Sequence, residues 1–156
     1  MPQIRKGGKY VYGWSIIKND FSIQFPIEAI TEYDICSEGK IFLITGSKTT
    51  GGFAVSKKSL LDKSILNNVF IEYNDLGNYK TREGDFYQYK SRKYAWIKID
   101  KDGIIYLNKA ILNNLSLKIN DKLLSIRSSN IAFMMGAKGP LINEANKYNG
   151  IINIYG

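Results

Sequence analysis

Apolar runs separated by short polar turns predict that strands dominate this chain. Four runs rich in β-branched and aromatic residues have the composition of strands: residues 9–17, 21–25, 93–99 and 104–107. The polar turn Lys18-Asn19-Asp20 separates the first two runs, and residues 100–103 separate the last two with an Asp-Gly pair. Asp-Gly between β-rich runs is a strong hairpin signal, so two β-hairpins are predicted.

Each predicted hairpin precedes the pattern of a short helix. Apolar residues recur at helical spacing, with Ile27 and Ile30 in the first helix and Ile111 and Leu115 in the second. Asn108 can cap the second helix through its side-chain oxygen. Further elements are predicted in both parts of the chain: strands at residues 41–45, 52–55, 123–127 and 131–135, and helices at residues 58–68 and 140–148.

An internal duplication explains why the pattern recurs. Trp14 and Trp96 lie 82 residues apart, and the sequences around them align without a gap. Identical residues match at this offset: Tyr12 and Tyr94, Ile17 and Ile99, Asp20 and Asp102, Ile23 and Ile105, Lys40 and Lys122, Ile44 and Ile126, and Ser47 and Ser129. Two repeats are therefore predicted, at residues 9–68 and 92–148.

Two segments have no counterpart in the repeat, a connector at residues 69–91 and a tail at residues 149–156. The apolar residues 151–155 predict a strand in the tail. The connector is rich in tyrosine and is predicted to form a hairpin or a lid. Its aromatic side chains either stack on nucleic acid or pack against the body of the protein or another copy. Acids in the same stretch would repel phosphate and favour packing.

Charge directs attention to polyanions. The net charge is +8, and residues 92–156 carry ten bases against four acids. A basic surface favours nucleic acid as a partner, although compositional drift toward Lys, Ile and Asn explains the same excess.

Composition also excludes several kinds of chemistry. The chain has no histidine, and its one cysteine, Cys36, rules out an intramolecular disulfide and a cysteine metal cluster. No catalytic residue, metal or cofactor is predicted. The first residues contain no apolar run and no stretch approaches a membrane-spanning length, so neither a signal peptide nor a membrane segment is expected. A cytoplasmic location is the expectation.

Short motifs follow the predicted hairpin in both repeats. They are Ser22-Ile-Gln-Phe-Pro-Ile-Glu-Ala-Ile, Tyr33-Asp-Ile and Glu38-Gly-Lys-Ile-Phe-Leu-Ile in the first repeat, and Ile105-Tyr-Leu-Asn-Lys-Ala-Ile-Leu, Leu115-Ser-Leu and Asn120-Asp-Lys-Leu-Leu-Ser-Ile in the second. This order resembles the swapped-hairpin family of AbrB, SpoVT, MazE and MraZ. The family signature joins a β-hairpin, an I-P-x-E-L helix start, a short helix, a G-[DE]-x-[LVI] turn and a strand. The resemblance covers most of residues 9–55 and 92–137.

The resemblance implies a mainly β fold, barrel-like with short helices. Two swapped-hairpin AbrB-like repeats would form an intramolecular pseudo-dimer, in which each repeat lends a hairpin to the sheet of the other. A unit of about 45 residues buries too little apolar surface to fold alone. Fusing two units replaces a bimolecular association by a loop closure.

The resemblance also implies a transcriptional regulator that binds duplex DNA. Basic residues on the hairpins and the preceding arm would contact phosphates: Arg5, Lys6, Lys9, Lys18, Arg92, Lys93, Lys98 and Lys101. The chain departs from the DNA-binding members after the helix start, because residues 30–32 and 112–114 contain no arginine. This departure weakens the case for base readout, in which arginine to guanine is the commonest contact.

A glycine-rich loop is a second candidate site: Gly46, Ser47, Lys48, Thr49, Thr50 and Gly51. Such backbone and hydroxyl groups can cradle phosphate, but the spacing is not that of a P-loop. The loop is a tight connection between strands, a ligand or anion loop, or a DNA contact. The alternative to DNA binding is therefore an interaction or small-ligand module on the same fold, which uses this loop and the connector. Assembly into a homo-oligomer stays open in either case.

Overall fold

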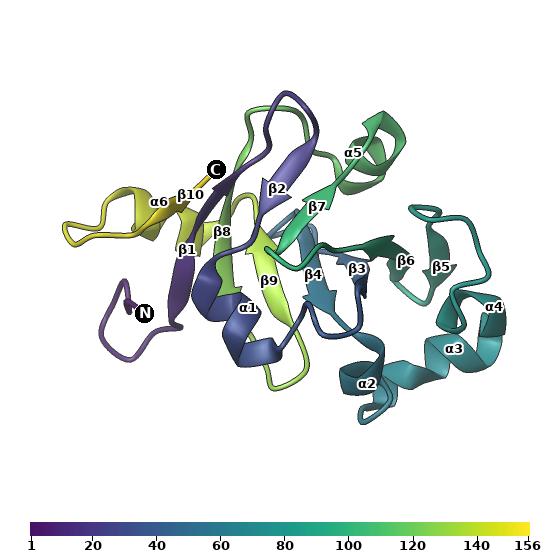
Figure 1. Ribbon diagram of the computed structural model, residues 1–156. Coiled ribbons are helices and arrows are strands. Elements are labelled where there is room, and N and C mark those ends of the chain that lie inside the picture. Colours follow the sequence, from purple (N-terminus) through teal and green to yellow (C-terminus); the bar gives the residue numbers. More distant parts are fainter.

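Strands account for most of the regular structure, and six short α-helices lie between them (Figure 1). The computed structural model describes residues 1–156. The strands are β1 Val11–Ile16, β2 Ser22–Gln24, β3 Lys40–Thr45, β4 Phe53–Ser56, β5 Tyr87–Tyr89, β6 Arg92–Lys98, β7 Ile104–Tyr106, β8 Lys122–Arg127, β9 Phe133–Gly136 and β10 Ile154–Tyr155. The helices are α1 Ile27–Tyr33, α2 Lys58–Leu61, α3 Asn68–Glu72, α4 Asn74–Gly77, α5 Lys109–Leu115 and α6 Pro140–Asn146, with a 3-10 turn at Ile65–Asn67. The chain is thus a mixed α/β protein that is mostly β.

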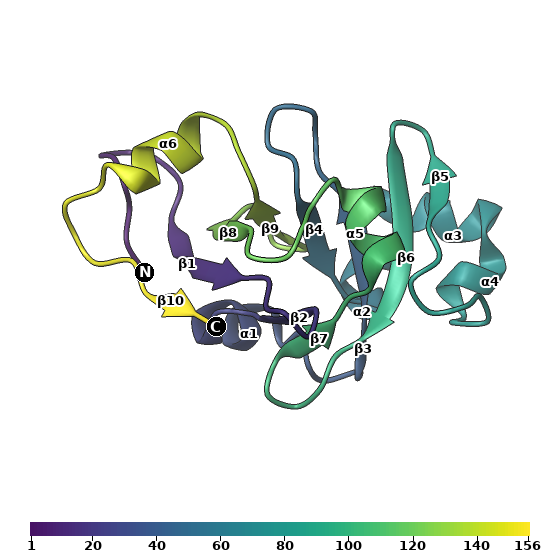
Figure 2. The ribbon, with the colours of Figure 1, turned by 90° about the horizontal axis from the view of Figure 1, so that it is seen from above.

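Eight strands form one large sheet in the order β10-β1-β8-β9-β4-β3-β6-β5. Its neighbours pair antiparallel except β10, which runs parallel to β1. Strands β2 and β7 form a separate antiparallel pair. In Figures 1 and 2 this pair lies across one face of the large sheet.

The two predicted hairpins exist only as turns. In the first, the Lys18 N–H donates to the Ser22 carbonyl at 3.0 Å, and the second turn is closed in the same way. Beyond the turn the arms separate, so that β1 pairs with β8 and β2 pairs with β7. Burial accounts for this choice of partner, because Ile23 and Ile105 face each other at the centre of the β2–β7 ladder and both are fully buried.

Equivalent elements stand 82 residues apart. Helix α1 and strands β2 and β3 recur at this offset as α5, β7 and β8, with the same lengths. The pairings recur as well, since Trp14 pairs with Leu124 in the β1–β8 ladder and Phe42 pairs with Trp96 in the β3–β6 ladder. Each tryptophan therefore occupies an equivalent place, opposite a residue from the other half of the chain.

The main core lies between the large sheet and the layer of β2, β7, α1 and α5. It contains 22 buried residues. The Phe133 ring contacts Phe25 and Tyr12 edge-on, with ring centroids 5.5 and 6.3 Å apart. Two smaller clusters cover the other face of the sheet, one around Trp96 under the connector and one around Trp14 under α6.

The first predicted closing helix is broken. In place of one helix at residues 58–68, α2 is followed by a 3-10 turn and then by α3. The Ser64 hydroxyl accepts from the Leu66 N–H at 3.1 Å, and a hydroxyl that caps a new turn competes with continuation of the helix. The predicted cap at Asn108 is confirmed, because its side-chain oxygen accepts from the Ile111 N–H at 2.8 Å.

The connector folds as α3, α4 and β5. Strand β5 forms a hairpin with β6 across the turn Lys90-Ser91. The tyrosines of the connector pack against the Trp96 cluster, which confirms that they pack on the body of the protein: Tyr73, Tyr79, Tyr87 and Tyr89. The predicted tail strand is also confirmed as β10, in which Ile154 pairs with Trp14.

Candidate basic surface and glycine-rich loop

The N-terminal arm, which precedes β1, places Arg5 and Lys9 beside α6. Arg5 Nη1 lies 3.2 Å from Glu144 Oε1, so this arginine is held in an ion pair. Lys9 is exposed and lines the same shallow hollow as Arg5, while Lys6 is exposed before it. The arm therefore offers two free lysines and one neutralised arginine.

The three turn lysines are exposed and lie in different surroundings: Lys18, Lys98 and Lys101. The residue before Lys18 donates its backbone N–H to the Asp121 carbonyl at 3.0 Å, which places the first turn beside the second half of the chain. Lys98 stands opposite Lys40 in the β3–β6 ladder. Lys101 lies in the second turn between two aspartates.

The remaining predicted bases, Arg92 and Lys93, lie at the start of β6. Arg92 Nη1 donates to the Thr45 carbonyl at 3.4 Å. Lys93 Nζ lies 3.5 Å from Oδ1 of Asn114 in α5. Of the eight residues predicted to contact DNA, Arg5 and Lys9 line a hollow beside α6, whereas Lys93 contacts Asn114 of α5.

A denser group of lysines surrounds the end of α5. Asn114 and Lys138 line a hollow of about 460 Å³ beside the glycine-rich loop. An adjoining hollow of about 580 Å³ shares Lys138 with the first. Five lysines line these hollows or contact Asn114, and we call them the basic surface: Lys48, Lys93, Lys118, Lys122 and Lys138.

Almost no acidic side chain lies close enough to neutralise the lysines of the basic surface. None of its lysines takes part in an ion pair. Asp121 is the one acid that lines either hollow, and its Oδ2 accepts from the Lys118 backbone N–H at 2.9 Å. Positive charges with low-dielectric walls and few acids attract anions.

Only part of this surface is predictable from the sequence. Lys93 was expected to contact DNA and Lys48 to lie in the glycine-rich loop, whereas no role was predicted for Lys118, Lys122 or Lys138. The basic excess of the second half was the available signal. Its positions could not be grouped without the fold, because the lysines come from four separate segments.

The glycine-rich loop closes on itself. The Gly46 N–H donates to the Gly52 carbonyl at 3.0 Å, and the Gly51 N–H donates to the Ser47 carbonyl at 2.8 Å. The hydroxyls of Ser47 and Thr50 lie 3.1 Å apart and bond each other. These amides and hydroxyls are used within the loop, which connects β3 to β4 and leaves Lys48 exposed.

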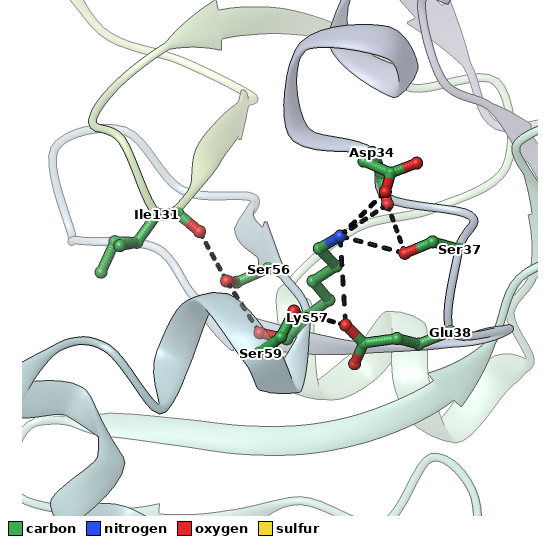
Figure 3. Close-up of polar contacts among 7 residues, drawn as sticks. All are labelled: Asp34, Ser37, Glu38, Ser56, Lys57, Ser59 and Ile131. Atoms are coloured by element: carbon green, nitrogen blue, oxygen red, sulfur yellow. Dashed lines mark hydrogen bonds and ion pairs between the residues drawn. The ribbon is translucent and has the colours of Figure 1, made fainter.

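Lys57 is the centre of a polar cluster between α2 and the turn after α1 (Figure 3). Its Nζ donates to the Asp34 carbonyl and to Ser37 Oγ, both at 3.0 Å, and lies 4.0 Å from Glu38 Oε2. A serine beside a buried lysine is the pairing of some nucleophilic enzymes. Here Ser37 donates its own proton to the Asp34 carbonyl at 2.9 Å, and the larger hollows are lined by other residues. The cluster ties two elements together.

The side chains with shifted pKa values are buried or hydrogen-bonded within the protein. Hydrogen bonds from the Ser22 hydroxyl and backbone N–H hold the pKa of Asp20 below its usual value. Burial raises the pKa of the Cys36 thiol, and the nearby Asp100 raises it further, so the thiol stays protonated at neutral pH. Burial raises the pKa of Tyr79 to about 12.

No protein-family model matches the chain, and no curated protein matches it. None of the helices combines the length and the apolar character that crossing a membrane requires. No three acidic or cysteine side chains gather closely enough to hold a metal ion.

Proposed function

We propose that this chain is a DNA-binding protein of the AbrB-like type, built as an intramolecular swapped-hairpin pseudo-dimer. The exchange of strands supports the fold assignment, since β1 pairs with β8 of the second half and β6 pairs with β3 of the first. The two predicted repeats, at residues 9–68 and 92–148, would each complete the sheet of the other.

The basic surface carries the proposal of DNA binding. Its five lysines come together from both halves and lack carboxylate partners, so they are available to phosphate. Neutralising phosphates with lysine releases counterions, and this term supplies most of the affinity of sequence-independent binding. Lys18 extends the surface, because its turn lies beside Asp121.

We expect the protein to contact the phosphate backbone of DNA and not the edges of the bases. The chain has four arginines, and all of them are engaged within the protein: Arg5 with Glu144, Arg82 with Asp85, Arg92 with Thr45, and Arg127 with Glu32. No arginine lines the hollows of the basic surface, so the commonest specific contact to guanine is not supplied there. We expect weak sequence preference and strong dependence on salt.

A triple variant tests the basic surface. Lys48→Gln, Lys93→Gln and Lys118→Gln together should weaken binding of a random duplex at least about tenfold at low salt, because three phosphate contacts are lost. The slope of log K against log salt should become shallower by about 2–3. Fluorescence anisotropy at several salt concentrations measures both quantities.

The matched control removes the same charge elsewhere. Lys63→Gln, Lys80→Gln and Lys90→Gln change three exposed lysines at or near the connector. This variant should stay within about threefold of the unmodified chain at 0.15 M salt, where the Debye length is about 8 Å, because none of its lysines lines the hollows of the basic surface or contacts Asn114. An equal loss in both triple variants would reject the basic surface as the interface.

The engaged arginines also favour a second candidate function, an interaction or small-ligand module on the same fold. No retardation of duplex by micromolar protein at low salt would favour this candidate and reject DNA binding.

A further inference from the structure

The tail, residues 149–156, covers the outer edge of β1 (Figure 1). Strand β10 pairs with β1 over only two residues, with Ile154 opposite Trp14. The Trp14 N–H also donates to the Asn153 carbonyl at 2.8 Å. This ladder is the only parallel one in the large sheet, and β10 is the outermost strand on that side. A short segment from the other end of the chain therefore closes the edge of β1.

Gly13 in β1 lacks a side chain at the place where the tail crosses. A Cβ there would lie 2.7 Å from Cε2 of Tyr155 and 2.9 Å from the carbonyl oxygen of Asn153, and the three nearest atoms all belong to the tail. At the 82-residue offset the residue is Ala95 in β6, which carries a side chain. Glycine within a strand often marks the close approach of another segment. Gly13 is therefore the seat of the tail, and the Tyr155 ring lies in it.

Few other contacts hold the tail. It carries no charged side chain, and no ion pair involves it. None of the backbone N–H groups of residues 149–153 donates to another backbone group. Ile152 packs against the cluster around Trp14, whereas Ile151 and Ile154 are 85% and 59% exposed. The tail can therefore leave β1 without breaking any other ladder of the sheet.

The opposite edge of the sheet is built differently. There the outermost strand, β5, continues into β6 through the turn Lys90-Ser91, and the Tyr73 hydroxyl donates to the Gln88 carbonyl at 2.6 Å. Strand β10 is joined to α6 by residues 147–153, which form no helix or strand and are mostly exposed. A strand tied by a tight turn stays with its partner, whereas a strand on a longer exposed segment can pair with another copy.

We propose that the outer edge of β1 is a strand-addition site, and that the tail of a second copy of this chain binds there when the chain's own tail is displaced. Main-chain hydrogen bonds give such a site its affinity, and the places for side chains give it specificity. Here the seat at Gly13 takes a tyrosine, and the cluster around Trp14 takes an isoleucine. The incoming tail has the sequence of the one it replaces, so the present ladder can form again. This site does not depend on DNA binding.

A synthetic tail peptide tests the site. The peptide has the sequence of residues 149–156 with a fluorophore at its N-terminus, and its anisotropy is followed as the full-length chain is added. The unmodified chain should bind it weakly, because its own tail occupies β1. Tyr155→Ala should bind it at least about tenfold more tightly, since the fraction of chains with an open site rises. Tyr106→Ala, which changes an exposed tyrosine in β7, is the matched control and should bind like the unmodified chain.

Two changes locate the peptide on β1. A peptide with alanine in place of its tyrosine should bind the Tyr155→Ala chain at least about tenfold more weakly, because the seated ring is lost. Adding Gly13→Ala to Tyr155→Ala should weaken the original peptide as much, because a methyl group would fill the seat. Circular dichroism shows whether the Gly13 variant is folded, and if it is not, the alanine peptide decides alone. Equal binding of the two peptides, or equal binding by the unmodified and Tyr155→Ala chains, would overturn the proposal.

A mixture of two variants tests the second copy as the partner. Tyr155→Ala has an open β1 edge and a poor tail, whereas Gly13→Ala has an intact tail that its own β1 cannot seat. Each variant alone should sediment as a monomer, and the mixture should contain a heterodimer. The unmodified chain mixed with Tyr155→Ala is the control and should stay monomeric, because its tail is already docked. A mixture of the two variants that stays monomeric above the Kd of the peptide would reject a second copy as the partner.

Discussion

At the scale of single residues, Lys57 has the most unusual environment. It is the only charged residue that is buried, with 7% of its surface exposed. Its partners are less buried, since the Asp34 side chain is 77% exposed, so the tie depends on hydrogen bonds to a backbone carbonyl and a hydroxyl more than on the ion pair. The aliphatic stem of such a lysine packs while its head stays bonded.

Replacing Lys57 by methionine should lower the free energy of unfolding by about 1–2 kcal/mol, because two hydrogen bonds are lost while the stem is kept. Urea denaturation measures the change. Lys58→Met is the control, and should stay within about 0.5 kcal/mol because its bond to Asn78 is exposed. Equal stability of the two variants would mean that the cluster contributes nothing.

The partners of Lys57 lie 19–23 residues earlier in the sequence, and no local pattern pairs them. The caps were easier to predict. Asn108 caps α5 three residues ahead of its donor, so both members of that contact lie within one turn. Contacts of short sequence separation were predictable at this scale, and contacts between elements were not.

At the scale of elements, the glycine-rich loop is shaped by close backbone approach. Gly52 has φ +62°, and a Cβ there would lie 1.9 Å from the Met135 carbonyl oxygen in β9. A Cβ on Gly46 would lie 1.9 Å from the carbonyl oxygen of Gly51. Glycine is needed at these positions because neighbouring backbone occupies the space of a side chain.

Gly52→Ala should lower the free energy of unfolding by about 2–4 kcal/mol, since backbone strain and a steric clash combine. Gly39→Ala isolates the strain, because Gly39 has φ +70° and open space around its Cβ position. That control should cost about 1 kcal/mol. Thermal unfolding followed by circular dichroism compares the two variants. Equal losses of stability would show that the Met135 carbonyl in β9 moves away from the added methyl group.

The sequence pattern predicted the positions of most elements within the two repeats, but not those within the connector. Strands, turns and short helices lie where apolar runs, Asp-Gly and caps predicted them. The break after α2 and the helices of the connector were not predicted. Residues 58–68 have apolar side chains at helical spacing, and this spacing stays the same whether the helix continues or Ser64 caps a new turn within it.

At the scale of the whole molecule, the two halves are coupled through their strands. The long ladders β1–β8 and β3–β6 both join residues from different halves, and so does β4–β9 at the centre of the sheet. Neither half can complete its part of the large sheet alone. The proposed pseudo-dimer therefore makes folding a property of the whole chain.

Separate fragments 1–90 and 91–156 should each lack a cooperative thermal transition as monomers, and mixing them should restore the circular dichroism of the intact chain. The reason is that each fragment lacks the strands that pair with its β1 or β6. The cut falls between two exposed turn residues. A fragment that folds as a monomer, judged by sedimentation, would contradict the exchange of strands. A fragment that folds as a homodimer would agree with it.

Spacing and composition along the chain were enough to predict where most strands and turns lie, the 82-residue repeat, the basic excess of the second half and the lack of histidine. These are local or additive properties. The separation of the hairpin arms, the grouping of lysines on one surface, and the packing of Tyr79 beside Trp96 but of Lys122 over Trp14 could not be predicted in this way. Each of these outcomes depends on which distant segments exclude water from one another, and that choice is made by burial across the whole chain.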